Sequence, residues 1–350
     1  MSEEKTVIFG WDIGGAHLKL AIKETCLTHV QQYICPIWQG MDKLENILSQ
    51  IIKAYPIAVQ AQHHITMTAE LADIFPDRET GIQQIHECIS RYLPIENIYY
   101  FTGDALIQGA LINPQHYQAI ASANWLATTC HISQYHAEGL VIDVGSTTTD
   151  IIPFFAGEPA HRGYTDQERL YTGELVYTGI TRTALMSLTN KAPWAGQWLP
   201  LMAEHFATTA DIYRLTEQLP TGIDLHPAAD NGEKTLLGSA RRLARLLAND
   251  IYGEDEVPAY QQLAHYFIRQ QKYKLHAALE LHYAYHRIQA NTPFIGVGVG
   301  RFLVQQLAQE FKQPYYDSSE LFKATSQTIS NQAAMCAPAA ALTYLSYLIE

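Results

Sequence analysis

One short pattern occurs twice in this chain, and in both copies it sets carboxylates beside a turn of small or hydroxyl-bearing residues. The first copy is GWDIGGAHLK at residues 10–19, and the second is IDVGSTTTDI at residues 142–151. Each copy lies between two apolar runs, which predicts a β-hairpin whose tight turn exposes backbone N–H groups. Such N–H groups can bind phosphate oxygens, and carboxylates beside them can hold Mg²⁺. The repeat therefore predicts a duplicated fold with two phosphate-binding loops.

The two copies supply a defined set of candidate residues. The carboxylates expected to hold Mg²⁺ are Asp12, Asp143 and Asp150. The phosphate donors are expected at Gly14, Gly15 and Lys19 in the first copy and at Gly145, Ser146, Thr147 and Thr148 in the second. Two alternatives stay open, because Lys19 also suits an ordinary edge-strand lysine and the hydroxyls also suit a turn chosen for β propensity.

A third glycine-rich element, IGVGVG at residues 295–300, lies between an expected strand and an expected helix. Its candidate ligand-binding residues are Gly296, Gly298 and Gly300. It is a weak match to the dinucleotide fingerprint, because Arg301 stands where the third glycine of G-x-G-x-x-G would fall. The alternative is a glycine turn that lets the helix pack close to the strand.

The elements that must position these residues alternate between strands and helices, which predicts an α/β architecture. Strands are expected at residues 26–34, 62–67, 98–101 and 293–299, and helices at 41–55, 81–92, 115–130, 234–249, 258–287, 301–311 and 331–348, with a helical insertion at 199–219. The pattern breaks at residues 135–139. We therefore expect a first domain over 1–135 and a second over 136–350.

Composition and charge limit the function. A chain of 350 residues exceeds one ordinary core and favours two domains, and 47% hydrophobic against 17% charged residues is typical of a globular enzyme. The net charge of −12 disfavours nucleic acid and anionic membranes as partners, because both demand a positive surface. Small molecules are the expected partners, and the oligomeric state is left open.

The cysteines and the start of the chain bear on location. The five cysteines are scattered and form no C-x-x-C pair, which favours a reducing compartment. The first residues, MSEEKTVIFG, lack the basic region and long apolar core of a signal peptide. No apolar stretch approaches the roughly 20 residues of a membrane helix. We expect a cytoplasmic protein.

Two phosphate loops followed by a strand, a glycine turn and a helix resemble the superfamily of acetate kinase, sugar kinases, actin and the heat-shock chaperone ATPases. The resemblance implies a duplicated RNase H-like two-domain fold with a central cleft. The first loop would lie in domain 1–135, and the second loop, the helical insertion and the late glycine turn in domain 136–350. In that superfamily the loops hold phosphates and the glycine turn lies against adenosine, so ATP is a candidate cofactor besides Mg²⁺.

A narrower resemblance covers almost the whole chain. Its motifs are DIGGAHLK at 12–19, TMTAELAD at 66–73, ASANWLAT at 121–128, IDVGSTTTDIIP at 142–153, TGELVYTGITRT at 172–183 and SARRLARL at 239–246. They are similar to the hydantoinase/oxoprolinase-like family linked to tetrahydromethanopterin-dependent one-carbon transfer. The resemblance implies a transferase of methanofuran or methylofuran biosynthesis, in which an aminomethylfuran methyl diphosphate condenses with γ-glutamyltyramine or a tyrosine-type phenol and releases diphosphate.

The implied reaction assigns roles to the candidate residues. Asp12 and Asp143 would be catalytic, because their loops and Mg²⁺ would stabilise the departing diphosphate while a furfuryl-type carbon takes on positive charge. Glu70 is the candidate general base for the attacking phenol, with a helix N-terminal carboxylate as the alternative. The resemblance alone places Glu174 and Tyr177 in the acceptor pocket.

Two other function classes stay open. An ATP-dependent small-molecule kinase and a non-catalytic nucleotide sensor would use the same three elements, and likeness of fold does not transfer chemistry. Other features are expected to be inert. His63 and His64 would face opposite sides of a strand, and Arg241, Arg242 and Arg245 would form a solvated basic face of a helix.

Overall fold

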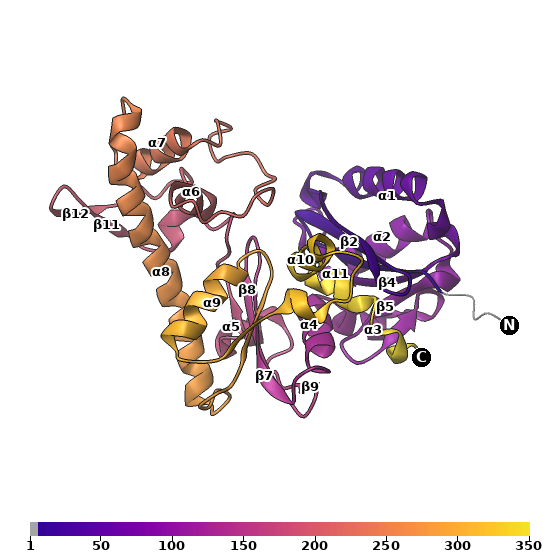
Figure 1. Cartoon of the computed structure of the whole chain (residues 1–350). Helices are drawn as coiled ribbons and strands as arrows, with labels where there is room; N and C mark the ends of the chain where they lie inside the picture. Colours follow the sequence, from indigo (N-terminus) through magenta and orange to yellow (C-terminus); the bar gives the residue numbers. More distant parts are fainter. Residues whose placement is uncertain (1–5) are drawn as a thin grey trace. The chain divides into compact units, whose positions relative to one another are not determined.

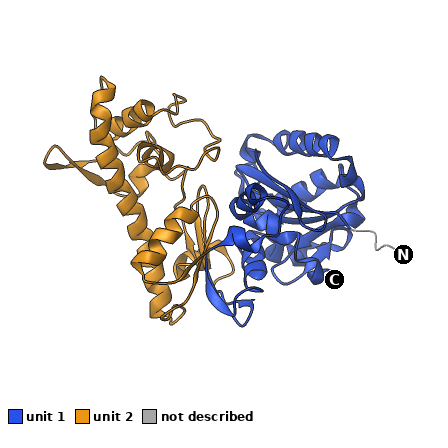
Figure 2. Cartoon of the chain, viewed as in Figure 1, with its two compact units in different colours: residues 1–141, 152–161, 317–350 blue, residues 142–151, 162–316 orange. Residues whose placement is uncertain are grey.

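The computed structural model describes residues 6–350 (Figure 1). The chain forms two compact units (Figure 2). Unit 1 comprises residues 6–141, 152–161 and 317–350, and unit 2 comprises residues 142–151 and 162–316. The end of the chain therefore returns to the unit in which the described chain begins.

Unit 1 contains a six-stranded sheet in the order β3-β2-β1-β4-β5-β6. Its strands are β1 (Ile8–Ile13), β2 (His17–Lys23), β3 (Leu27–Ile34), β4 (Gln62–Met67), β5 (Ile98–Phe101) and β6 (Leu106–Gln108). The first three strands are antiparallel neighbours, whereas β4 runs parallel to β1 and β5 parallel to β4. This arrangement puts the turn between β1 and β2 at the same edge of the sheet as the carboxyl end of β4.

Helices cover this sheet because their apolar residues recur every three or four positions. In α1 (Asp42–Ala54) the buried side chains are Leu44, Ile47, Leu48 and Ile51, and they join the core cluster that includes β1 and β4. Each such buried side chain contributes roughly 1.5–3 kcal/mol of hydrophobic free energy. The other helices of unit 1 are α2 (Arg78–Ser90), α3 (Pro114–Ile120), α4 (Asn124–Ile132), α10 (Gln327–Met335) and α11 (Ala337–Leu342). The last of these, α11, contacts β1 and α4.

A second sheet has the order β10-β8-β7-β13-β14, with β9 added beside β8. Its strands are β7 (Glu138–Val144), β8 (Thr149–Phe155), β9 (Glu158–Pro159), β10 (Leu175–Val176), β13 (Phe294–Val297) and β14 (Tyr315–Asp317). With β9 left aside and the other strands counted from β7, this is the order third, second, first, fourth, fifth, which is also the order of the first five strands of the sheet in unit 1. The predicted duplicated α/β fold of RNase H-like strand order is confirmed.

The second copy carries a large insertion between β10 and β13. It contains a hairpin of β11 (Lys191–Trp194) and β12 (Gln197–Pro200), followed by α6 (Thr209–Leu215), α7 (Leu236–Leu246) and the long α8 (Val257–Ala284). Helix α9 (Arg301–Glu310) and the short α5 (Asp166–Thr172) complete unit 2. The expected helix at 199–219 is therefore wrong in part, because only α6 is helical there and β12 ends at Pro200.

Two other expected helices are broken. The stretch 115–130 forms α3 and α4, separated at Ser122, whose φ of +52° is incompatible with a continuous helix. The stretch 331–348 contains the end of α10 and all of α11, separated at Cys336. The expected boundary between residues 135 and 136 stays a prediction, as does the central cleft. Within residues 6–350, no helix is long and apolar enough to cross a membrane.

Candidate functional site

The first predicted loop is the turn between β1 and β2, and it begins with a buried ion pair. Asp12 and Lys19 are partners in the strand register, and the Lys19 Nζ lies 2.8 Å from the Asp12 Oδ2. Asp12 is only 2% exposed. Its other oxygen, Oδ1, is buried and accepts no hydrogen bond from any residue in the described part of the chain. A buried carboxylate oxygen without a donor is costly, so this atom is suited to a bound cation or water.

The backbone of this turn leaves two N–H groups for a ligand. The Gly14 N–H closes the turn on the His17 oxygen at 2.9 Å. The carbonyls of Gly15 and Ala16 accept bonds from Ile37 and Cys35, each at 3.0 Å. Over residues 6–350, the N–H groups of Gly15 and Ala16 themselves have no acceptor. Adjacent N–H groups of this kind form an anion-binding nest.

The second predicted loop repeats this backbone. The Gly145 N–H donates to the Thr148 oxygen at 2.9 Å, as Gly14 does to His17. Neither Ser146 nor Thr147 has an acceptor for its N–H among the described residues. Both turns therefore offer two consecutive donors at equivalent positions, and the sequence pattern identified both.

The two loops differ in how their carboxylates are balanced. Asp150 occupies the position equivalent to Lys19, and it forms an ion pair with Arg169, which is only 2% exposed. Asp12 pairs with the lysine across its own hairpin, whereas the charge of Asp150 is compensated from α5. The half-buried Asp143 corresponds to Asp12. The three carboxylates proposed as metal ligands are thus not equivalent.

The third predicted element packs directly on the second loop. Gly298 has a φ of +80°, and a Cβ at this position would lie 2.3 Å from the Asp143 Oδ1. The Gly300 N–H donates to the Val144 oxygen at 2.9 Å, and Gly296 faces the ring of Tyr315. The structure therefore brings Gly298 and Asp143 together within unit 2. Close packing explains these glycines, and their role beside adenosine stays a prediction.

Glu70 lies in the short 3-10 helix η3 (Ala69–Leu71) after β4 and is 1% exposed. The Ser122 Oγ donates to the Glu70 Oε1 at 2.9 Å, which joins the TMTAELAD and ASANWLAT motifs. Glu70 stands in the first turn of η3, which is the position that the helix N-terminal alternative requires, so that alternative stays open. Its role as a base stays a prediction.

Glu174 has a structural role that the resemblance did not indicate. It is fully buried and accepts bonds from the backbone N–H of Arg162 at 2.6 Å, the N–H of Gly163 at 2.9 Å and the Thr172 hydroxyl at 2.8 Å. These donors engage its carboxylate and hold residues 162–163 against it. Tyr177, by contrast, is 69% exposed.

Two residues at the second loop were missed by the sequence analysis. The Arg182 Nη1 donates to the Thr147 hydroxyl oxygen at 3.2 Å. The Gln271 amide, fully buried in α8, donates to the Thr178 hydroxyl at 3.0 Å and to the Gly179 oxygen at 2.8 Å. Arg182 could have been found as the one cation of the TGELVYTGITRT motif. Gln271 has no local pattern, because it contacts residues about 90 positions earlier.

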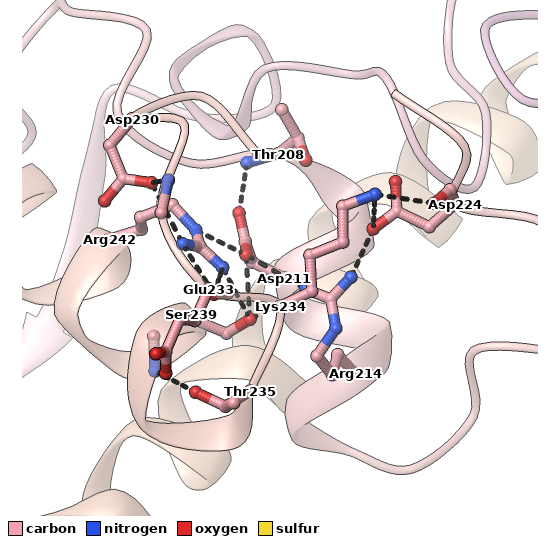
Figure 3. A network of polar contacts seen from close by, with 12 residues as sticks. Thr208, Asp211, Arg214, Asp224, Asp230, Glu233, Lys234, Thr235, Ser239 and Arg242 are labelled. Carbon is pink, nitrogen blue, oxygen red and sulfur yellow. Dashed lines mark hydrogen bonds and ion pairs between the residues drawn. The ribbon is translucent and has the colours of Figure 1, made fainter. Parts of the chain in front are cut away.

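The expected solvated basic face of residues 241–245 is wrong for Arg242. This guanidinium is fully buried, and it lies 2.8 Å from the Asp211 Oδ1 and 3.0 Å from the Asp230 Oδ1 (Figure 3). Arg242 of α7 lies on the side of the helix that faces Asp211 of α6, whereas the preceding residue, Arg241, is exposed. A buried arginine needs such partners. The network fastens residues 224–235 to α6 and α7.

The histidines expected to be inert are structural. The Trp11 Nε1–H donates to the His63 Nδ1 at 3.1 Å, so the His63 Nε2 carries the proton and donates to the Ala58 oxygen at 2.8 Å. His64 instead bonds the Leu342 oxygen through Nδ1 at 2.8 Å. Over residues 6–350, no group of three or more His, Cys, Asp or Glu side chains is arranged to hold a metal. Mg²⁺ held by one or two carboxylates and a phosphate does not need such a group.

Two sheets of one strand order, each with a nest at its first hairpin, define a duplicated α/β protein with paired glycine- or hydroxyl-rich loops. A family model described as hydantoinase/oxoprolinase matches residues 62–336. The chain belongs to this family.

Two archaeal relatives are similar in sequence. The chain is 30% identical over 247 residues, which is 70% of this chain and 73% of the relative, to a protein of Methanocaldococcus jannaschii named (4-{4-[2-(gamma-L-glutamylamino)ethyl]phenoxymethyl}furan-2-yl)methanamine synthase. It is 35% identical over 113 residues, 32% of this chain, to half of a protein of the same name from Methanococcus vannielii.

Two solved structures are similar over nearly the full length. Component A of (R)-2-hydroxyglutaryl-CoA dehydratase from Acidaminococcus fermentans has a TM-score of 0.45 at 9% identity, covering 97% of both chains. A ROK family glucokinase from Streptomyces griseus has a TM-score of 0.45 at 13% identity, covering 98% of this chain and 99% of the glucokinase. At these scores they add nothing to the fold assignment, which comes from the strand order.

Proposed function

We propose that the chain is a transferase of methanofuran or methylofuran biosynthesis that joins an aminomethylfuran methyl diphosphate to a phenol. The observation that carries the proposal is the 30% identity over 70% of the chain to the Methanocaldococcus jannaschii synthase. The name of that relative describes an aryl ether, in which a phenol oxygen is bonded to a furan-methyl carbon. An enzyme that forms this ether must activate the carbon and accept the phenol.

The proposed step is a substitution at the furan-methyl carbon. The bond between that carbon and the diphosphate oxygen breaks, and the electron pair leaves with the diphosphate. The phenol oxygen forms the new bond, and its proton passes to a base. Because positive charge develops on the carbon and negative charge on the leaving group, donors aimed at the diphosphate lower the barrier.

The loops supply groups that fit a diphosphate. The N–H pairs at Gly15–Ala16 and Ser146–Thr147 would bind its oxygens. Asp12 fits Mg²⁺ because its Oδ1 is buried without a donor among the described residues. Asp143 and Asp150 are the further proposed ligands, although Asp150 must share its charge with Arg169. Mg²⁺, when bound, would offset charge on the departing diphosphate.

Glu70 is proposed as the base that takes the phenol proton. It is buried, and the Ser122 hydroxyl donates to one of its oxygens and orients the carboxylate. The proposed acceptors are γ-glutamyltyramine and its tyrosine-type counterpart. All five cysteines are free thiols, which supports the proposed cytoplasmic location.

An ATP-dependent kinase is the second candidate. The observation that favours it is the packing of Gly298 against Asp143, which joins the late glycine turn to a phosphate loop within one unit. A kinase would place adenosine at that turn. A nucleotide sensor would bind ATP there without turnover.

The deciding measurement is diphosphate release from the aminomethylfuran methyl diphosphate with Mg²⁺. Parallel reactions contain γ-glutamyltyramine, γ-glutamyltyrosine or no acceptor, and a further reaction contains ATP in place of the diphosphate substrate. Release that depends on the acceptor, with the ether product found by mass spectrometry, supports the transferase. Phosphate transfer or hydrolysis from ATP with no ether product would support the kinase instead.

A further inference from the structure

We infer that Arg182 is an anion-binding residue of the second loop and contacts the diphosphate in the proposed reaction. The inference rests on the proposed function only for the identity of the anion. Neither the hairpin pattern nor the glycine turn includes this residue. The position of Arg182 is set by the segment at residues 178–183, which is hydrogen-bonded to the loop.

The backbone of this segment is fastened to the loop along its length. Ile180 donates its N–H to the Gly145 oxygen at 3.0 Å, and Thr181 and Arg182 both donate theirs to the Ser146 oxygen, at 3.1 and 3.0 Å. A Cβ at Gly179 would lie 2.5 Å from the backbone nitrogen of Thr147, so only glycine permits this approach. The backbone of Arg182 is therefore fixed relative to the N–H pair of Ser146 and Thr147.

The guanidinium of Arg182 is directed at the same turn. Its Nη1 donates to the Thr147 hydroxyl at 3.2 Å, while the residue as a whole is exposed. A guanidinium has five N–H donors in a planar fork that matches two oxygens of a phosphate. A diphosphate held by the Ser146 and Thr147 N–H groups would thus lie within reach of a fixed positive charge.

The surrounding charges explain why the loop needs this residue. Asp143 and Asp150 flank the turn, and a loop with two carboxylates repels a diphosphate unless cations accompany it. Arg169 is bound to Asp150, Asp166 and the Glu174 oxygen, so its charge is directed to that group of residues. Arg182 supplies a second cation on the side of Thr147.

The charge of Arg182 also reaches the segment held by the network in Figure 3. Desolvation and then the charge of Arg182 lower the pKa of His226, with Lys234 acting in the same direction and Asp224 opposing. Lys234 is itself fastened by a 2.6 Å bond to the Asp224 oxygen (Figure 3). Cations from two separate segments, Arg182 and Lys234, therefore both act on His226.

The test is calorimetric titration of the full chain with inorganic diphosphate and Mg²⁺. Arg182→Gln should weaken the affinity by roughly tenfold or more, because a hydrogen bond between charged groups is lost, and Arg182→Lys should restore part of it. Arg241→Gln is the matched control, since this exposed arginine of α7 lies outside the loop. The diphosphate affinity of this control variant should equal that of the natural chain. The affinity of the natural chain should also fall more steeply with added salt than that of Arg182→Gln.

The dependence of affinity on salt separates contact with the anion from support of the turn. If Arg182 contacts diphosphate, Arg182→Lys keeps the positive charge, and its affinity should fall with added salt as steeply as that of the natural chain. If Arg182 acts only by holding the Thr147 hydroxyl, the affinities of the natural chain and of Arg182→Gln fall equally with added salt, which would overturn the inference.

Failure of the inference and failure of the proposed function give different results. Equal diphosphate affinity in the natural chain and Arg182→Gln, or no binding by the natural chain, overturns the inference. A natural chain that binds diphosphate through Arg182 but forms no ether overturns the proposed function and leaves the inference intact.

Discussion

At the scale of single residues, the two loops carry the same backbone but different carboxylate chemistry. Asp12 shares its charge with Lys19 through one oxygen and buries the other without a donor among the described residues. Asp150, across the second hairpin, is bound to Arg169. A chain that needed only a stable hairpin would not bury an unsatisfied carboxylate oxygen at this turn, because that burial costs free energy. Asp12 is therefore the carboxylate whose removal is most informative.

We predict that Asp12→Asn and Asp143→Asn each lower the rate of diphosphate release by about 100-fold or more, because each removes charge that would hold Mg²⁺. The side chains keep their size, and Lys19 is 25% exposed and can be hydrated, so the free energy of unfolding of Asp12→Asn should fall by only about 1 kcal/mol. Release assays and denaturant titrations measure the two effects. Full activity in both variants would exclude the proposed metal site.

At the scale of elements, the second loop is hydrogen-bonded to the segment at 178–183, and this segment is bonded in turn to α8. The Tyr213 hydroxyl donates to the Gln271 oxygen at 2.7 Å, and the Gln271 amide nitrogen bonds Thr178 and Gly179. A continuous set of bonds thus joins α6 and α8 to the loop. The helical insertion therefore supports the site as well as enlarging the unit.

We predict that Gln271→Leu lowers the free energy of unfolding by about 3 kcal/mol. The substitution leaves the Tyr213 hydroxyl, the Thr178 hydroxyl and the Gly179 oxygen without the Gln271 amide as their buried partner. Each unpaired group costs about 1–3 kcal/mol. Burial of the apolar leucine side chain offsets part of this cost. Denaturant titration measures the loss. The control is Gln261→Leu in the same helix as Gln271. It removes one partly buried hydrogen bond to the Leu215 oxygen of α6 and should cost about 1 kcal/mol.

We predict that Gly179→Ala disrupts the second loop itself, because its Cβ would lie 2.5 Å from the Thr147 nitrogen and the two backbones must separate. Diphosphate affinity should fall together with stability. The control is Gly196→Ala in the β11–β12 turn, where φ is +77° and nothing lies within 4 Å of the new methyl group. It should lose about 1 kcal/mol from backbone strain and no affinity. Unchanged affinity in Gly179→Ala would show that the segment does not shape the loop.

The elements also show what sequence reasoning can reach. Strands β4 and β5 were predicted to the residue, because each is a short apolar run with clear boundaries. Both loops were found because a local pattern repeats. Arg182, Gln271 and the inward turn of Arg242 were missed, since their partners are 35, 93 and 31 positions away and no local periodicity encodes such contacts. The breaks at Ser122 and Cys336 were missed because single residues there override helix propensity.

At the scale of the whole molecule, the end of the chain, residues 317–350, belongs to unit 1. Buried histidines make the packing of this segment sensitive to acid. His64 bonds the Leu342 oxygen at 2.8 Å. His131 bonds the Leu321 oxygen at 3.2 Å and stacks on both Phe322 and Tyr344, with ring centroids 4.9 and 4.6 Å away. Desolvation lowers the pKa of His63, His64 and His131 to about 4 each. All three are therefore neutral in the folded protein at neutral pH.

We predict that the free energy of unfolding falls as the pH is lowered from about 6.5 to about 4. In this window the unfolded chain binds protons at these histidines and the folded chain does not, so their contribution is fully present above pH 6.5 and is lost on acidification. One pKa unit corresponds to about 1.4 kcal/mol, so each histidine contributes up to about 3 kcal/mol. Denaturant titrations across this range measure the slope of the free energy of unfolding against pH. The slope should become smaller in His131→Phe, because one of the three groups is gone. The control is His265→Gln, at an exposed position of α8, which should leave the slope unchanged. A slope equal in all three proteins would mean that His131 does not couple the C-terminal segment to pH, and the acid sensitivity would then have to come from His63 and His64 alone.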